Sequence, residues 1–176
     1  MQCCFTQFAK EGPGKKHGFA RNSENWQVVD MQGDAASSGW PATTLRLVGH
    51  GNEDADWPNS FVLDMTLTLG EESLRQTMKV TNTNPSGEAF SFTTALHTYF
   101  AVGDASKTHL TGVKGLTYHT ANEAKTGSFE EDRELATMAE LTDRIYYSAP
   151  GKICAVLTYL YIYIMHATPR HGLGDG

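Results

Sequence analysis

The most constraining feature of the sequence is a two-residue alternation near its centre. In residues 61–69 every second residue is a large apolar one, and a similar alternation, with Gln76 in place of one apolar residue, resumes in residues 74–80. Successive side chains of a β-strand point to opposite faces of a sheet, so each run predicts a half-buried strand. Residues 70–73 (GEES) between them have the composition of a turn. The two runs therefore predict an antiparallel hairpin.

Several shorter segments also have the composition of strands, and they are residues 26–31, 43–48, 90–100, 108–113 and 144–148. Residues 135–141 could form a short helix, and the polar residues 122–134 predict a loop. Many short strands separated by turn signals are typical of a β-sandwich or barrel. A chain of 176 residues is long enough for one domain with a real core. The sequence therefore predicts one mostly-β domain.

Charge and cysteine content exclude several classes of protein. Fourteen Lys and Arg against twenty Asp and Glu leave a net charge of -6, and the basic residues are scattered, so neither nucleic acid nor an anionic membrane is an expected partner. Three cysteines without disulfide or metal-ligand spacing indicate a reduced, cytoplasmic setting. The N-terminus has no secretory signal pattern.

The most apolar run of the sequence lies near its C-terminal end. Residues 153–165 (ICAVLTYLYIYIM) are fewer than the roughly 20 needed to cross a bilayer as a helix. Their β-branched and tyrosine content predicts a buried strand instead. Residues 167–176 have the composition of a disordered tail.

His97 is the strongest catalytic candidate that the residues alone provide. Its imidazole titrates near neutral pH and belongs to the more polar face of the predicted strand 90–100, so it can exchange a proton with a substrate. The alternative is a structural histidine that bonds to neighbouring Thr or Tyr hydroxyls. Both interpretations remain open at this point.

Three other residues can contact a polar ligand. Residues 12–18 are rich in Gly and Lys and predict a loop, with His17 near its end and Arg21 just after it. A guanidinium there can grip an anion such as phosphate, although a surface salt bridge is the alternative. Asp143 is either a ligand for hydroxyls or a turn residue. Neighbouring acidic residues such as Glu130, Glu131 and Asp132 are interpreted as solvated loop charge. No histidine pair has a convincing metal-ligand spacing.

Six segments resemble, in order, those of the glucose-6-phosphate 1-epimerase (hexose-6-phosphate mutarotase) branch of the aldose 1-epimerase-like family. They are residues 4–8 (CFTQF), 17–21 (HGFAR), 80–83 (VTNT), 92–100 (FTTALHTYF), 115–118 (GLTY) and 142–146 (TDRIY). The resemblance extends over roughly residues 4–152. Its specificity exceeds that of any single motif.

This resemblance implies a partial β-supersandwich, the galactose mutarotase-like fold, and interconversion of the α and β anomers of a hexose 6-phosphate without metal or organic cofactor. It makes His97 the acid that protonates the ring oxygen. It assigns Arg21 to the sugar-phosphate site and Asp143 to the sugar hydroxyls. It also places Lys16 and His17 among the substrate-binding residues, with Lys16 at a position where the family usually has a substrate-contacting Gln.

The sequence departs from the family pattern at both ends. The family's base is a Glu that follows a Trp-Asn-Pro-Trp-like stretch, and the sequence has no such stretch. We therefore expect a partial mutarotase-like domain in residues 1–152, a divergent tail in residues 153–176, and truncation at both ends. An active epimerase, an inactive carbohydrate-binding β-sandwich and a non-functional fragment remain the alternatives.

Overall fold

The alternating run at the centre of the sequence forms the longest strands of the protein. In the computed structural model, which describes residues 2–10, 12–32, 39–120, 126–157 and 160–165, β4 (Ser60–Leu69) and β5 (Leu74–Asn82) make the expected antiparallel hairpin. On the inner side of β4, Phe61, Leu63 and Met65 are buried. The predicted hairpin is confirmed, and so is the buried face that the alternation indicates.

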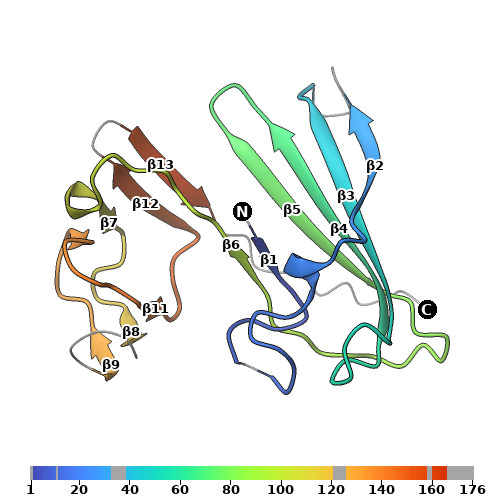
Figure 1. Cartoon of the computed structure of the whole chain (residues 1–176). Coiled ribbons are helices and arrows are strands. Elements are labelled where there is room, and N and C mark those ends of the chain that lie inside the picture. Colours follow the sequence, from blue (N-terminus) through green and yellow to red (C-terminus); the bar gives the residue numbers. More distant parts are fainter. Residues whose placement is uncertain (1, 11, 33–38, 121–125, 158–159, 166–176) are drawn as a thin grey trace. The chain divides into compact units, whose positions relative to one another are not determined.

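Residues 1–99 form the first of two compact units. Its main sheet has the order β2-β3-β4-β5, in which β2 (Gln27–Gln32) and β3 (Ala42–His50) match the predicted strands 26–31 and 43–48 (Figure 1). A second, two-stranded sheet joins β1 (Gln2–Cys4) to β6 (Ala95–His97). A 3-10 turn, η1 (Ala20–Asn22), follows the Gly-rich loop.

The core of this unit lies on the inner face of the main sheet. Phe5 is completely buried and meets the rings of Trp57, Phe61 and Phe92 edge-on, with centroids 5.8, 4.9 and 5.1 Å away. Edge-to-face contacts of this kind add to the hydrophobic stabilisation of the buried rings. The short strand β1 is therefore fixed to the sheet by the residue that follows it.

The outer face of the same sheet is polar. Arg46 on β3 makes a bidentate ion pair with Asp64 on β4, with nitrogen–oxygen distances of 2.6 and 2.8 Å. The hydroxyls of Thr44 and Thr66 lie 2.9 Å apart on the same two strands. Opposite charges and paired hydroxyls on facing positions stabilise a strand register. The register of β3 and β4 is thus set by apolar contacts on one face and polar contacts on the other.

Gly49 on β3 leaves room for the ring of Phe61, its register partner on β4. A methyl group at Gly49 would overlap that fully buried ring. We expect Gly49→Ala to lower the free energy of unfolding of this unit by about 1–3 kcal/mol, measured by urea denaturation, because the crowded ring must leave its rotamer. Gly14→Ala is the control in the same unit, since its added methyl meets no atom closer than 3.4 Å; equal effects would contradict the crowding argument.

Residues 100–176 form the second unit, which has two small antiparallel sheets of order β10-β7-β12-β13 and β11-β8-β9. The elements of this unit are η2 (Ala105–Lys107), β7 (His109–Thr111), β8 (Thr117–Thr120), β9 (Gly127–Glu130), β10 (Ala136–Thr137), β11 (Ile145–Tyr146), β12 (Lys152–Leu157) and β13 (Leu160–Met165). The apolar run 153–165 thus forms most of a hairpin that pairs with β7. The boundary after residue 152 stays a prediction, and the predicted tail 167–176 lies outside the described residues.

Three local predictions are wrong. The segment 90–100 is a strand only at β6, since its partner β1 has three residues and Phe90 instead packs its ring against Trp57, 5.2 Å away. The segment 135–141 contains the two-residue strand β10, paired with β7, and no helix. Within the predicted loop 122–134, residues 127–130 form β9, which pairs with β8. In each case the pairing partner, distant in sequence for β6 and β10 and adjacent for β9, determines the structure.

Candidate functional site

Two imidazoles lie together at the junction of β1, β6 and the Gly-rich loop. His97 is the last residue of β6, and its ring stands edge-on to that of His17 with the centroids 5.9 Å apart. The ring of Tyr99 stacks on the imidazole of His97, with the ring centroids 4.7 Å apart and an interplanar angle of 23°. Contacts with two rings hold the imidazole of His97 in one orientation. In the described part of the chain no hydrogen bond to a Thr or Tyr hydroxyl accompanies them.

The loop that carries His17 is folded around a buried amide. Gln7 is only 4% exposed; its Nε2 donates to the carbonyl of Ala9 at 3.2 Å, and its Oε1 accepts from the amide of Gly14 at 2.9 Å. The amide of His17 also donates to the carbonyl of Ala9, at 3.0 Å. These bonds satisfy backbone groups of the loop that would otherwise need water. They fix the position from which His17 reaches β1 and β6.

The backbone at His17 and Gly18 turns in the left-handed region, with φ values of 67° and 66°. Such values are costly for a residue with a Cβ and are often found at functional sites. A Cβ at Gly18 would overlap the backbone of Phe5 and Thr6, so only glycine fits there. The order His17-Gly18 in the sequence is therefore explained by the backbone. The chain turns sharply at these two residues, and the absence of a Cβ at Gly18 lets it pass against Phe5.

The charged residues next to this histidine pair are basic. Arg21 lies in η1, half-buried, and its guanidinium donates to the carbonyl of Lys16 at 3.4 Å. Burial of the ring, followed by the positive charges of Arg21 and Lys16 and by His97, lowers the pKa of His17. Four of the predicted site residues, His97, His17, Lys16 and Arg21, thus come together in the first unit. The electrostatics of this cluster suit an anionic ligand.

Asp143, the fifth predicted site residue, belongs to the second unit and has an exposed side chain. Next to it, the guanidinium of Arg144 donates to Glu131 at 2.7 Å and lies over the ring of Tyr118, 4.3 Å from its centroid. Arg144, the residue that follows Asp143, is therefore held in place by Glu131 and Tyr118. The role of Asp143 itself as a ligand for hydroxyls stays a prediction.

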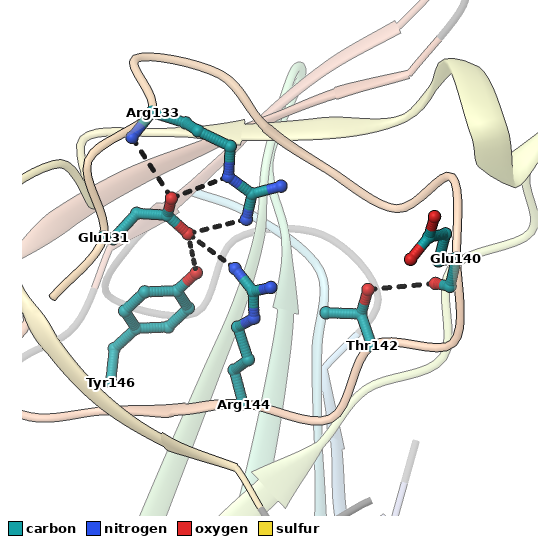
Figure 2. Close-up of polar contacts among 6 residues, drawn as sticks. All are labelled: Glu131, Arg133, Glu140, Thr142, Arg144 and Tyr146. Carbon is teal, nitrogen blue, oxygen red and sulfur yellow. Dashed lines mark hydrogen bonds and ion pairs between the residues drawn. The ribbon is translucent and has the colours of Figure 1, made fainter. Parts of the chain in front are cut away.

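Glu131 is the feature of this unit that sequence reasoning missed. It is 1% exposed, although it was expected to be solvated, and Figure 2 shows its carboxylate surrounded by Arg133, Arg144 and Tyr146. Arg133 donates at 2.7 and 2.8 Å and the hydroxyl of Tyr146 at 2.8 Å. The hydrogen bonds from Arg133 are the main cause that lowers the pKa of Glu131 to about 2. The available signal was the spacing Glu131–Arg133, which places both side chains on one face of an extended segment.

Two kinds of feature are absent from the residues that the structure describes. Among the residues that the structure describes, no group of three His, Cys, Asp or Glu side chains is arranged to hold a metal ion. In the same residues, no helix combines the length and the apolar composition needed to cross a membrane.

Comparison with known proteins gives consistent matches. A protein named "Putative glucose-6-phosphate 1-epimerase" from Cenchrus ciliaris is 32% identical over 156 residues, which are 87% of this chain and 47% of the relative. A protein of the same name from Escherichia coli (strain K12) is 32% identical over 141 residues, 80% of this chain and 43% of the relative. The chain thus spans about half the length of these curated relatives.

A solved structure confirms the fold. The crystal structure of a "putative mutarotase (YeaD)" from Salmonella typhimurium matches 87% of this chain and 48% of its own, with a TM-score of 0.65 and 24% identity. The expected mostly-β, mutarotase-like fold is therefore present. The sequence profile described as "Aldose 1-epimerase" matches residues 1–160. The chain belongs to the aldose 1-epimerase family.

Proposed function

We propose that this chain carries the sugar-phosphate site of a hexose 6-phosphate 1-epimerase, with His97 as the acid. The observation that carries the proposal is the edge-on pair of His97 and His17, 5.9 Å apart, next to the cationic Lys16 and Arg21. Membership of the aldose 1-epimerase family and the names of the two curated relatives support the same reaction and substrate class.

The basic residues favour a phosphorylated sugar over a neutral one. A phosphate dianion gains charge-assisted hydrogen bonds from a guanidinium, and these are roughly twice as strong as neutral hydrogen bonds. Arg21 and Lys16 are the groups that would supply this attraction, and His17 would contact the sugar. Asp143 would accept hydrogen bonds from sugar hydroxyls.

The reaction requires two coordinated proton transfers. His97 delivers a proton to the ring oxygen of the sugar while a base removes the proton of the anomeric hydroxyl. The bond from C1 to the ring oxygen breaks, and its electron pair stays on the ring oxygen. That oxygen takes the proton from His97 and becomes a hydroxyl. The C1 oxygen becomes the carbonyl of the open-chain aldehyde. Rotation about the C1–C2 bond followed by the reverse transfers closes the ring as the other anomer.

A second candidate function is sugar-phosphate binding without catalysis. It applies to residues 1–176 taken by themselves, which contain no Trp-Asn-Pro-Trp-like stretch with the following Glu that the family pattern uses as the base. A site with an acid but no base would bind the substrate and accelerate exchange little. The two candidates differ in a directly measurable rate.

The test is anomer exchange of glucose 6-phosphate, followed by NMR saturation transfer with the spontaneous rate subtracted. We expect His97→Gln to reduce the catalysed exchange rate by about 100-fold or more, because general acid catalysis typically contributes factors of about 10²–10⁴. His50→Gln is the control, because His50 is exposed at the end of β3, outside the histidine pair. Equal rates in wild type and His97→Gln would contradict the role of His97 as the acid.

Binding without exchange would support the second candidate, and calorimetry with glucose 6-phosphate and with glucose detects it. Arg21→Gln should remove the preference for the phosphorylated sugar while glucose affinity changes little. A chain that neither exchanges nor binds glucose 6-phosphate would contradict both candidates.

A further inference from the structure

The Nδ1 atom of His17 is surrounded by hydrogen-bond donors. The backbone amide of Ala9 lies 3.2 Å from it and the thiol sulfur of Cys4 lies 3.5 Å from it. A backbone N–H can only donate, so Nδ1 must accept and cannot itself carry a proton in this geometry. The thiol of Cys4, which is completely buried, must then donate as well. Two donors thus share one lone pair.

This arrangement opposes protonation of the ring. In an imidazolium, Nδ1 would carry a proton that points at the donor protons of the Ala9 amide and the Cys4 thiol. Both hydrogen bonds would then be lost inside a partly buried site. The surrounding charges act in the same direction. Lys16 and Arg21 are cationic, His97 is the facing imidazole, and together with burial they lower the pKa of His17. Burial also raises the pKa of Cys4, which keeps its thiol protonated as a donor.

We propose that His17 is a permanently neutral imidazole with its proton on Nε2, which donates a fixed hydrogen bond to a sugar oxygen, and that Cys4 is the residue that positions it. The assignment of the acceptor as a sugar oxygen rests on the proposed function. The protonation state does not, because it follows from the contacts of Nδ1 alone. The two histidines then have different duties: His97 transfers a proton, whereas His17 orients the substrate without changing charge.

Cys4 is suited to this positioning role by its place in the fold. It ends β1, where its register partner is Ala95, two residues before His97 on β6. One short strand pair thus carries both the thiol that orients His17 and the imidazole of His97. The adjacent Cys3 has a different environment, since its sulfur lies 3.6 Å from the sulfur of Met78. The two neighbouring cysteines therefore form a matched pair for substitution.

Long-range nitrogen–proton NMR of the imidazoles in the full chain, without sugar, tests the protonation state. We expect His17 to show an unprotonated Nδ1 and a protonated Nε2, unchanged from pH 8 down to about pH 6, where an ordinary histidine is largely protonated. A proton on Nδ1 of neutral His17, or a fully protonated ring at pH 6 in the folded chain, would overturn the proposal.

Substitution of Cys4 tests the positioning role. Cys4→Ala removes one donor, so His17 should titrate at a higher pH than in wild type. Cys4→Ser restores an O–H donor and should return the titration toward that of wild type. Cys3→Ala should leave it unchanged. The same titration in Cys4→Ala as in wild type would show that Ala9 alone holds the ring and would refute the role of Cys4.

Addition of glucose 6-phosphate separates this inference from the proposed function. We expect the Nε2 proton signal of His17 to shift on binding while Nδ1 stays unprotonated. A shift without anomer exchange would sustain the inference and refute catalysis. Saturable binding with an unmoved Nε2 signal would refute the donor role of His17, even if the sugar phosphate were turned over.

Discussion

Replacing Glu131 with glutamine should lower the free energy of unfolding of the second unit by about 3 kcal/mol. This is the lower end of the roughly 3–5 kcal/mol typical of breaking a buried ion pair. The variant leaves Arg144 without its carboxylate, and the side chain of Arg144 is only 13% exposed. The side chain of Arg133 is 37% exposed, so water can replace some of the hydrogen bonds that it loses. The hydroxyl of Tyr146 also loses its charged acceptor.

Hydrogen exchange measures this effect locally, which is necessary because the chain forms two compact units and a single unfolding free energy is not well defined. The reporters are the amides of Gly115, Glu131 and Tyr147, which bond to the carbonyls of Glu131, Leu116 and Thr117. We expect them to exchange about 100-fold faster, because each factor of ten corresponds to about 1.4 kcal/mol. Glu130→Gln is the matched control, since Glu130 is exposed. Similar exchange in both variants would contradict the anchoring role of Glu131.

The same substitution should alter the response to acid. The folded pKa of Glu131 is lowered from 4.5 to about 2, chiefly by the hydrogen bonds from Arg133. A lowered folded pKa contributes stability that is fully present above the unfolded pKa of 4.5 and is lost as the pH falls toward 2. Wild-type protection of the three reporter amides should therefore decline over this window. In Glu131→Gln this part of the decline should be absent.

Truncating Phe5 should have an effect of comparable size in the first unit. We expect Phe5→Ala to cost about 3–5 kcal/mol, because it leaves a cavity among three aromatic rings and removes the contacts that fix β1 to the main sheet. The carbonyl of Phe5 also accepts the amide of Ala20 at 3.0 Å, so movement at this residue reaches η1 and Arg21. Urea denaturation followed by tryptophan fluorescence measures the loss, since Trp57 contacts the ring directly.

Phe92→Ala is the appropriate comparison for Phe5→Ala. It removes a ring of the same size from the same aromatic cluster, but Phe92 is 38% exposed in the folded protein. Its cost should be clearly smaller than that of Phe5→Ala, because hydrophobic stabilisation scales with the apolar area removed from water. Equal costs would mean that Phe5 is not the centre of this core.

The strands that the sequence predicts well are those whose neighbours are close in the chain. β3, β4 and β5 follow one another through short connections, so alternation alone identified both the hairpin and its buried face, with Leu63 and Met65 on the inside. β1 and β6 pair across more than ninety residues of chain, Cys4 with Ala95 for example. No local pattern encodes such a pairing, and the predicted strand 90–100 was too long for that reason.

The candidate site divides in the same way. His97 was identifiable from its chemistry and from the family resemblance, and the grouping with His17, Lys16 and Arg21 followed from the HGFAR-like motif. The contact of Cys4 with His17 was not foreseen, because it depends on a left-handed turn at His17 that residue type does not predict. Glu131 was missed because it is one of three consecutive acidic residues, of which only one is buried. Burial within such a run is decided by distant partners, here Arg144 and Tyr146.

The Gln7 amide gives the loop before Lys16 and His17 an internal support that does not involve the core sheet. Its two bonds, to Ala9 and Gly14, act as a clasp around the segment between them. The position of His17 thus depends on the hydrogen bonds of Gln7 and of the Ala9 carbonyl more than on the side chains between Ala9 and Gly14. The loop is therefore a natural place for ligand preference to diverge, and it is where a protein engineer should insert or exchange residues to retune affinity for differently charged sugars.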